Sequence, residues 1–388
     1  MQLLEQQLSR GDDPITRLSR NLSVRSVIST ASSLAQQQLS SFQGSIHGFR
    51  EIGAGYCGIV FEQPGAISVL KKAKYGQLTL WNDYLMQAHI YDQFAIARRL
   101  FANQEVPRIT RPIYFTNADD DPTWWTENAG KFPPDHGVLQ TPVLCLERIF
   151  PLPKPIRDEL IDLFCPEPGR AGAKKAVGNR DCIIRLYLGR RRRNTSRPVK
   201  FFSLRNFSLH LDMAEQIQLD VGAFANEMAI GLALCHWRAK ADCNDVEFVL
   251  GSAPTILNFA VTPEQVRSMP MDSTTRPEAL HHNFEKRTAH LWMLDFDKCR
   301  NMAMTDEGIA QAVKAAEDND PYFPKPHKTQ PSDKMLWTTF SQAYIKASKT
   351  ILDADDVAEG LQDGPEKFIR GWEEYRKLKL EKWTDVDK

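Results

Sequence analysis

Residues 49–72 read FREIGAGYCGIVFEQPGAISVLKK, which predicts apolar strands around glycines and a Gln-Pro-Gly turn. Gly53, Gly55 and Gly58 fit the pattern G-x-G-x-x-G-x-V, in which glycines let the backbone approach phosphate groups closely. A Rossmann site is disfavoured, because a strand follows where a dinucleotide site needs a helix N-terminus. The stretch therefore predicts either a phosphate-covering hairpin or a plain hairpin that needs glycines for its twist.

Two lysines, Lys71 and Lys72, end this stretch at the distance from Val60 at which protein kinases place their phosphate-binding lysine. A solvated lysine at a strand end is the alternative. In kinases this lysine pairs with a glutamate of the next helix, but no glutamate occurs here between Lys72 and Gln104. The sequence therefore does not show the kinase Lys–Glu pair.

A second block, residues 235–251, reads CHWRAKADCNDVEFVLG. One long helix, expected over 213–240, would lead into His236, a turn and a short strand, which is the layout of a kinase catalytic loop. Matching the strand to the kinase strand that begins with the metal-binding Asn places Asp245 at that Asn. Lys240 then occupies the position of the catalytic base, so the kinase base is missing.

Asp295 lies in LDFD, residues 294–297, which resembles the magnesium-binding D-F-G of kinases with Asp297 in place of glycine. An ordinary buried strand that ends in a solvated aspartate is the alternative. Together the motifs predict an α+β, two-lobed protein-kinase-like fold. Its expected parts are a flexible arm (1–46), a small β-rich N-lobe with the glycine-rich hairpin (47–150), and a mainly helical C-lobe with a basic insertion at 169–205 (151–388).

Three acids, Asp242, Asp245 and Glu247, lie close together in the second block. The strand period of two predicts that Asp245 and Glu247 share one face. Clustered carboxylates raise one another's pKa, so they are expected to bind a metal or a cationic group. A structural ion-pair network with Arg238 or Lys240 is the alternative.

A D-D-x-x-E sequence is formed by Asp355, Asp356 and Glu359. On a helix this spacing brings Asp355 and Glu359 onto one face. The alternative is a solvated helix start, where acids favour the N-terminal dipole.

The basic segment 169–205 holds a dozen basic side chains and one acid, although the whole chain has 49 residues of each sign. Arginine forks match phosphates, and the interleaved aromatic residues can stack on unpaired bases, so an RNA partner is predicted. A nuclear-localisation signal or a solvated loop is the alternative. The predicted tRNA-binding residues are Lys174, Lys175, Arg190, Arg191, Arg192, Arg193, Arg197 and Lys200.

The seven cysteines are scattered and include no C-x-x-C pair. They are predicted to be reduced thiols of a cytoplasmic protein, with no disulfide framework and no metal site. No stretch is long and apolar enough for a transmembrane helix, and the charged start does not resemble a secretory signal. We therefore expect no membrane contact.

A family resemblance rests on five blocks: GAGYCGIVFE, VLKKA, LCLERIFPLP, HWRAKADCNDVEFVLGS and LWMLDFDKCR. They resemble a fungal family of kinase-like proteins that is classified as a domain of unknown function and labelled zinc-finger protein. The sequence itself has no zinc-ligand spacing. The family includes the fungal arginine-containing cyclodipeptide synthases. The resemblance implies that arginyl-tRNA and a second charged tRNA are used, without a cofactor, to make a cyclo(Arg-Xaa) dipeptide, and it ties the D-D-x-x-E residues to activity.

The leading hypothesis is therefore a cyclodipeptide synthase. One carboxylate cluster would hold the guanidinium by paired hydrogen bonds, and a nearby carboxylate would take the α-ammonium proton so that the amine can attack the second ester. The alternatives are an ATP-dependent small-molecule phosphotransferase and a non-catalytic kinase-like module that binds RNA or a partner. The predicted catalytic residues are Asp242, Asp245, Glu247, Asp295, Asp355, Asp356 and Glu359, and the predicted substrate- or phosphate-binding residues are Gly53, Gly55, Gly58, Lys71 and His236.

Overall fold

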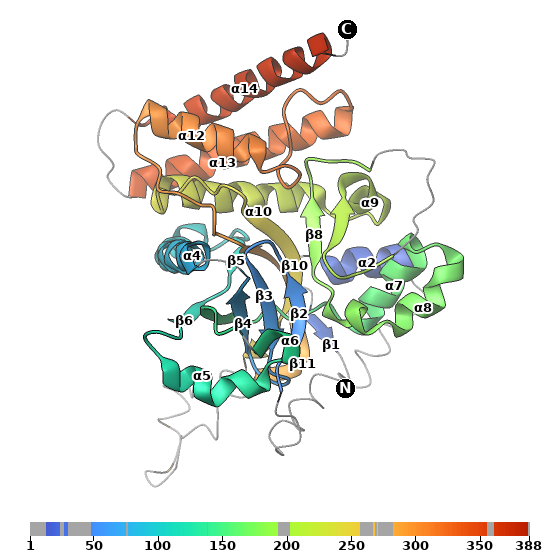
Figure 1. The fold of residues 1–388 in the computed structure, drawn as a ribbon. Helices are drawn as coiled ribbons and strands as arrows, with labels where there is room; N and C mark the ends of the chain where they lie inside the picture. Colours follow the sequence, from blue (N-terminus) through green and yellow to red (C-terminus); the bar gives the residue numbers. More distant parts are fainter. Residues whose placement is uncertain are drawn as a thin grey trace.

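The computed structural model describes residues 13–23, 27–29, 48–74, 77–137, 139–192, 202–256, 267, 270, 282–354 and 361–386. These residues form two β-sheets and a set of helices, with a β-rich N-terminal region and a helical C-terminal part (Figure 1). The predicted α+β class is confirmed. Within the described ranges, no helix combines the length and apolar character needed to cross a membrane.

The first sheet is antiparallel. Its strands are β2 (Arg50–Ala54), β3 (Gly58–Glu62), β4 (Ser68–Ala73), β6 (Pro112–Thr116) and β7 (Val143–Glu147), in the order β2-β3-β4-β7-β6. The predicted first strand is divided into β2 and β3, because the chain turns where the Gly55 N–H donates to the Gly58 carbonyl at 2.9 Å. Gly58 is required there, since a Cβ would lie 2.9 Å from the Lys72 carbonyl oxygen.

Helices cover both faces of the first sheet. The helix α4 (Gln77–Ala97), extended by a 3-10 turn (Arg98–Phe101), packs through Leu80 on one face. On the other face Trp125 of α5 (Pro122–Asn128) packs with Phe132, which lies between a 3-10 turn (Ala129–Lys131) and α6 (Pro134–Gly137).

The second sheet is built around a long antiparallel hairpin. Its strands are β1 (Val27–Ser29), β5 (Arg108–Ile109), β8 (Ile184–Tyr187), β9 (Phe207–His210), β10 (Glu247–Ile256) and β11 (His282–Leu294), in the order β1-β11-β10-β8-β9 with β5 beside β11. The strands predicted near 245–251 and before Asp295 are thus confirmed as β10 and the end of β11.

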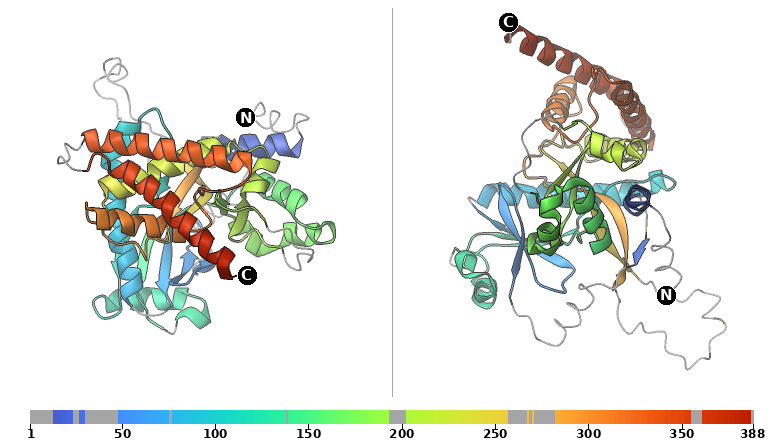
Figure 2. Two further views of the ribbon diagram at one scale, coloured as in Figure 1. Left: turned by 90° about the horizontal axis from the view of Figure 1, so that it is seen from above. Right: turned by 90° about the vertical axis from the view of Figure 1, so that its right-hand side faces the viewer.

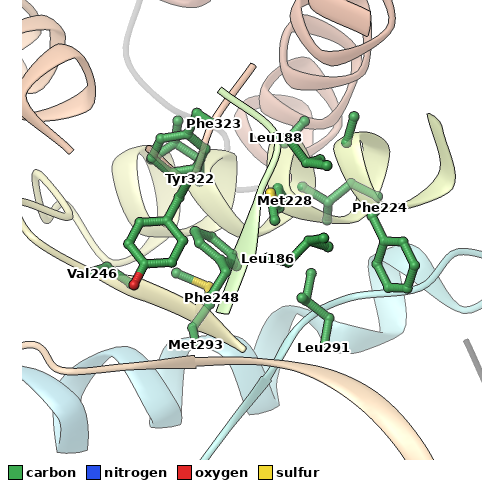
Figure 3. Close-up of a cluster of buried hydrophobic side chains, with 14 of the residues drawn as sticks. Leu186, Leu188, Phe224, Met228, Val246, Phe248, Leu291, Met293, Tyr322 and Phe323 are labelled. Atoms are coloured by element: carbon green, nitrogen blue, oxygen red, sulfur yellow. The ribbon is translucent and has the colours of Figure 1, made fainter. Parts of the chain in front are cut away.

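The helical part covers the second sheet (Figures 1 and 2). Its helices are α7 (Lys154–Phe164), α8 (Arg170–Lys175), α9 (Leu211–Gln216), α10 (Val221–Ala233), α12 (Asp306–Asp318), α13 (Pro331–Ala354) and α14 (Gly364–Val386), with 3-10 turns at Glu167–Gly169 and Val177–Asp181. The helix α10 packs against α13, and α12 packs against α14. Figure 3 shows the core between α10 and the sheet, where Met228 lies near Leu186, Phe248 and Met293.

Two expectations from the sequence are corrected here. The single helix expected over 213–240 is divided into α9 and α10, because the chain turns at Gln218 (φ 54°) and Asp220 caps α10 by accepting the Ala223 N–H at 2.9 Å. The arm 1–46 contains two ordered segments. The helix α2 (Pro14–Leu22) buries Leu18 and Leu22 in the main core, and β1 pairs with β11.

A candidate active-site cleft between the two sheets

A cleft of about 180 Å³ is lined by residues of both sheets. Gly53, Gly55 and Gly58 line it from β2, β3 and the turn between them. Lys71 lines it from β4, and Asp295, the residue directly after β11, also lines it. The structure therefore brings the predicted glycines, lysine and aspartate together at one site.

Lys71 lies between two carboxylates. Its Nζ donates to Asp83 Oδ2 at 2.6 Å and to Asp295 Oδ1 at 2.8 Å. Burial opposes the charge of Lys71, but the two carboxylates outweigh burial and raise its pKa above the ordinary value. Burial also raises the pKa of Asp83, and Lys71 counteracts part of that rise. The Phe296 N–H also donates to Asp83 Oδ1 at 3.0 Å. Through these bonds Lys71 and Asp83 link β4 and α4 to the residues after β11.

Asp83 is a site residue that the sequence analysis missed. The kinase pattern has a glutamate in the helix after the lysine, whereas the helix α4 supplies an aspartate. The sequence contains a usable signal, because Asp83 lies at helical spacing from the apolar residues Leu80 and Ile90. In the structure Leu80, Asp83, Gln87 and Ile90 are all buried. An acid within such a stripe needs a buried cation, and Lys71 was the candidate.

Glu247 is the acid most affected by its surroundings. It is the first residue of β10, its side chain is 17% exposed, and Arg185 of β8 pairs with it at 2.8 Å. Burial, with smaller contributions from Asp295 and Asp245, raises the pKa of Glu247 to about 7, although Arg185 opposes the rise. A carboxyl group with this pKa can accept and return a proton near neutral pH.

The predicted pairing of Asp245 and Glu247 on one strand face is wrong. The strand β10 begins at Glu247, which leaves Asp245 in the preceding turn with a φ of 64°. Asp245 is half exposed and pairs with Lys298 at 2.5 Å. The two carboxylates therefore have different environments and different partners.

Asp242 also lies apart from the cleft. It is 3% exposed and accepts the N–H groups of Asn244 at 3.1 Å and Arg300 at 2.9 Å. The Gln311 side chain donates to its second oxygen at 2.8 Å. This carboxylate joins the loop before β10 to the segment after β11, so the catalytic role predicted for it is replaced by a structural one.

The glycine turn is in contact with the segment after β11. The Cys57 thiol forms a hydrogen bond with Asp297, and Lys298 lies 5.8 Å from the ring centre of Tyr56. Burial, followed by the bond to Asp297, raises the pKa of Cys57 to about 12, so the group is a thiol. These contacts hold the turn close to Asp295.

His236 is a core residue, and its predicted role in substrate binding is corrected. It lies in the π-helical segment Leu234–Arg238 and is fully buried. Its Nδ1 lies 2.8 Å from the Tyr344 hydroxyl, and its ring packs on Phe368. Burial lowers its pKa to about 3, which keeps the ring neutral.

The basic segment is largely neutralised by acids from elsewhere in the chain. Lys174 pairs with Asp162 at 2.7 Å, and Arg190 pairs with Asp320. Arg191 pairs with Glu215 (2.6 Å) and Asp333 (2.5 Å), and Arg192 pairs with Asp212 (2.6 Å). Arg185 pairs with Glu247 and Arg205 pairs with Glu51, both at 2.8 Å. The expected concentrated positive patch is thus reduced. Lys175 is exposed on α8, and Arg193, Arg197 and Lys200 lie outside the described residues.

The D-D-x-x-E residues Asp355, Asp356 and Glu359 also lie outside the described residues, between α13 and α14. Their role stays a prediction.

Comparison with known proteins gives one partial match. Residues 291–356 match the model of a family of unknown function described as "Zinc finger protein". The matched part begins in β11, includes Asp295, and continues through α12 and α13. The described ranges contain no group of three or more His, Cys, Asp or Glu side chains placed to hold a metal ion. No curated protein matches the chain.

Proposed function

We propose that the protein is a kinase-like enzyme that makes a cyclo(Arg-Xaa) dipeptide from arginyl-tRNA and a second charged tRNA. The observation that carries the proposal is Glu247, a largely buried carboxyl group with a pKa of about 7 in the cleft that Lys71 and Asp295 also line. Such a group is suited to remove a proton from an α-ammonium group at neutral pH.

The kinase-like scaffold is supported by the order of the parts. The lysine lies on the third strand of an antiparallel sheet whose first two strands enclose the glycine turn. Its carboxylate partner comes from the helix that follows, and a second carboxylate comes directly after the long hairpin. Kinases place their glycine loop, lysine, helix acid and metal-binding aspartate in this order.

The charge of the cleft supports a cationic substrate. Five acidic and three basic side chains line it: Asp83, Glu147, Asp181, Glu247 and Asp295 against Lys71, Arg148 and Arg185. Outside the lining, Arg50 pairs with Asp181, Arg108 with Glu147, and Glu62 with Arg148. Lys71 is shared by two carboxylates, so negative charge remains in excess beside Asp295, whose side chain is 29% exposed. An arginyl group brings a guanidinium and an α-ammonium, and both would be attracted to this excess.

The reaction follows from this arrangement. Asp295 would hold the cationic arginyl group, and Glu247 would accept the α-ammonium proton. Glu247 would then pass the ammonium proton to solvent. The free amine would attack the ester carbonyl of the second aminoacyl-tRNA, and the ionised Glu247 would take the second N–H proton as the amide forms. Glu247 would give that proton to the leaving ribose oxygen as the ester C–O bond breaks. Attack of the second amine on the first ester closes the ring and releases the other tRNA. Each step breaks one ester and forms one amide, so the esters supply the activation.

The phosphotransferase is the second candidate, and the Lys71, Asp83 and Asp295 contacts favour it because kinases bind ATP through this arrangement. The contact of Cys57 with Asp297 weighs against it, since it closes the glycine turn onto the segment that would face the phosphates. Lys240 lines a different hollow and supplies no base to the cleft.

The test is incubation of the protein with charged tRNA that carries isotope-labelled arginine, followed by mass spectrometry of cyclic dipeptides. Labelled cyclo-arginyl product is expected from the parent protein and from Asp318→Asn, a change at an exposed surface acid. Its absence from the parent reaction, together with an increase in melting temperature on adding ATP and Mg²⁺, would favour the phosphotransferase.

A further inference from the structure

A second hollow of about 410 Å³, the basic groove, is not used by the reaction above. It lies between α4, the end of the π-helical segment and the chain after β11. Its lining residues include His89 and Gln93 of α4, Arg238 at the end of the π-helical segment, Lys240 of the loop before β10, and Asn301.

The lining of the basic groove contains three basic residues and no acid. Lys240 and His89 are exposed, and Arg238 is partly buried. Because the Ala239 carbonyl can only accept, the 2.8 Å contact from His89 Nε2 makes that nitrogen the donor. Basic side chains from two separate elements thus converge, with amide groups of Gln93 and Asn301 beside them. This combination suits phosphate oxygens.

The backbone of the groove is held by several hydrogen bonds. The Met302 N–H donates to the Lys240 carbonyl at 2.7 Å, and Ala241 forms an antiparallel bridge with Asn301. The Asp242 N–H donates to the Arg300 carbonyl at 3.0 Å. These bonds keep Lys240 at a φ of 53°, which is uncommon for lysine, and fix the position from which its side chain extends.

The groove lies near the cleft along the chain and along α4. His89 follows Asp83 on one helix, and at 1.5 Å per residue the two are separated by about 9 Å along the axis. The loop that follows Arg238 carries Lys240 and leads through residues 241–246 to Glu247. A polyanion bound in the groove would therefore contact the helix that also carries the cleft residue Asp83 and the loop that leads to the cleft residue Glu247.

We propose that the basic groove binds backbone phosphates of the RNA that delivers the aminoacyl group. This inference rests on the proposed function. The inference also places the main phosphate contacts outside the basic segment 169–205.

The experiment measures binding of unfractionated uncharged tRNA as a function of salt. The groove variant is Arg238→Gln with Lys240→Asn, because asparagine tolerates the left-handed backbone at position 240. The matched control, Arg190→Ala with Arg192→Ala, also removes two cations. Loss of two phosphate contacts should reduce the slope of log affinity against log salt by about 1.4 to 1.8 in the groove variant, and leave it nearly unchanged in the control.

The single variant Lys240→Asn separates binding from folding. It keeps Arg238 and should reduce the slope by about half as much, with an unchanged melting temperature. A full slope in both groove variants, or no tRNA binding by the parent protein, would overturn the proposal. Groove-dependent tRNA binding without any cyclic dipeptide would instead contradict the proposed function and leave the phosphate site standing.

Discussion

The cleft and the arginine run 190–192 of the basic segment differ in how their charges are compensated. In the cleft, Lys71 is shared by two carboxylates, and burial raises the pKa of Glu247 to about 7. In the basic segment, Arg190 and Arg192 each meet one acid near the surface. The segment looks more charged in the sequence, yet the cleft contains the charges with unusual properties. In this chain, a buried charged group that is not fully neutralised by its partners is a better guide to a candidate active site than the number of charged residues in a segment.

The largest expected effect is the loss of stability on replacing Lys71 in the cleft. Lys71→Met would leave Asp83, which is 2% exposed in its side chain, without its cation, and removing one partner of a buried pair costs about 3 to 5 kcal/mol. The free energy of unfolding in urea measures this loss. Lys72→Met is the matched control, because Lys72 Nζ donates to the neutral Thr141 hydroxyl at 2.9 Å and its loss should cost about 1 kcal/mol. Equal losses would show that the two tandem lysines are equivalent.

The next effect concerns the proton acceptor. Glu247→Gln keeps the size of the side chain but cannot accept a proton, so formation of the cyclic dipeptide should fall by about 10²- to 10⁴-fold. In the parent protein only the ionised carboxylate is a base, so the rate should rise with pH through about 7 and then level off. Rates measured from pH 5.5 to 8.5 test both points. A glutamine variant as fast as the parent would exclude Glu247 as the base.

Local patterns were enough to predict much of the fold. The glycines of 53–58 and the apolar runs on either side predict the hairpin, and the LDFD sequence marks the end of a buried strand. Lys71 and Asp295 were both predicted as site residues, and they meet at 2.8 Å. These features depend on short-range spacing, which a single sequence displays.

The features of the site that the sequence did not predict depend on contacts between residues that are far apart along the chain. Asp83 was missed because the expected partner was a glutamate, and Asp245 separates from Glu247 because β10 begins two residues later than the pattern suggested. His236 is buried by Tyr344 and Phe368, which lie more than a hundred residues further along the chain. Spacing along one segment carries no information about such partners.

A smaller effect is expected from the residue that holds Glu247. Arg185 lowers the pKa of Glu247, so Arg185→Gln should raise that pKa further. The rise of rate with pH should then move to higher pH, while the rate at the plateau stays close to that of the parent. A pH profile of product formation distinguishes this positioning role from a structural one, because a general loss of folded protein would lower the rate equally at every pH. An unshifted midpoint would contradict the role.

The smallest effect is expected in the basic segment. Arg192 pairs with Asp212 at 2.6 Å, but its side chain is 48% exposed, and such surface pairs contribute about 0.2 to 1 kcal/mol. Arg192→Ala should therefore change the free energy of unfolding by no more than this amount. Arg191→Ala is the comparison within the same segment, because Arg191 joins Glu215 to Asp333, which is only 9% exposed, and its loss leaves that acid without its cation. Urea unfolding should rank Arg191→Ala above Arg192→Ala. The reverse order would mean that exposure does not govern these charges, and the contrast between the cleft and the segment would then fail.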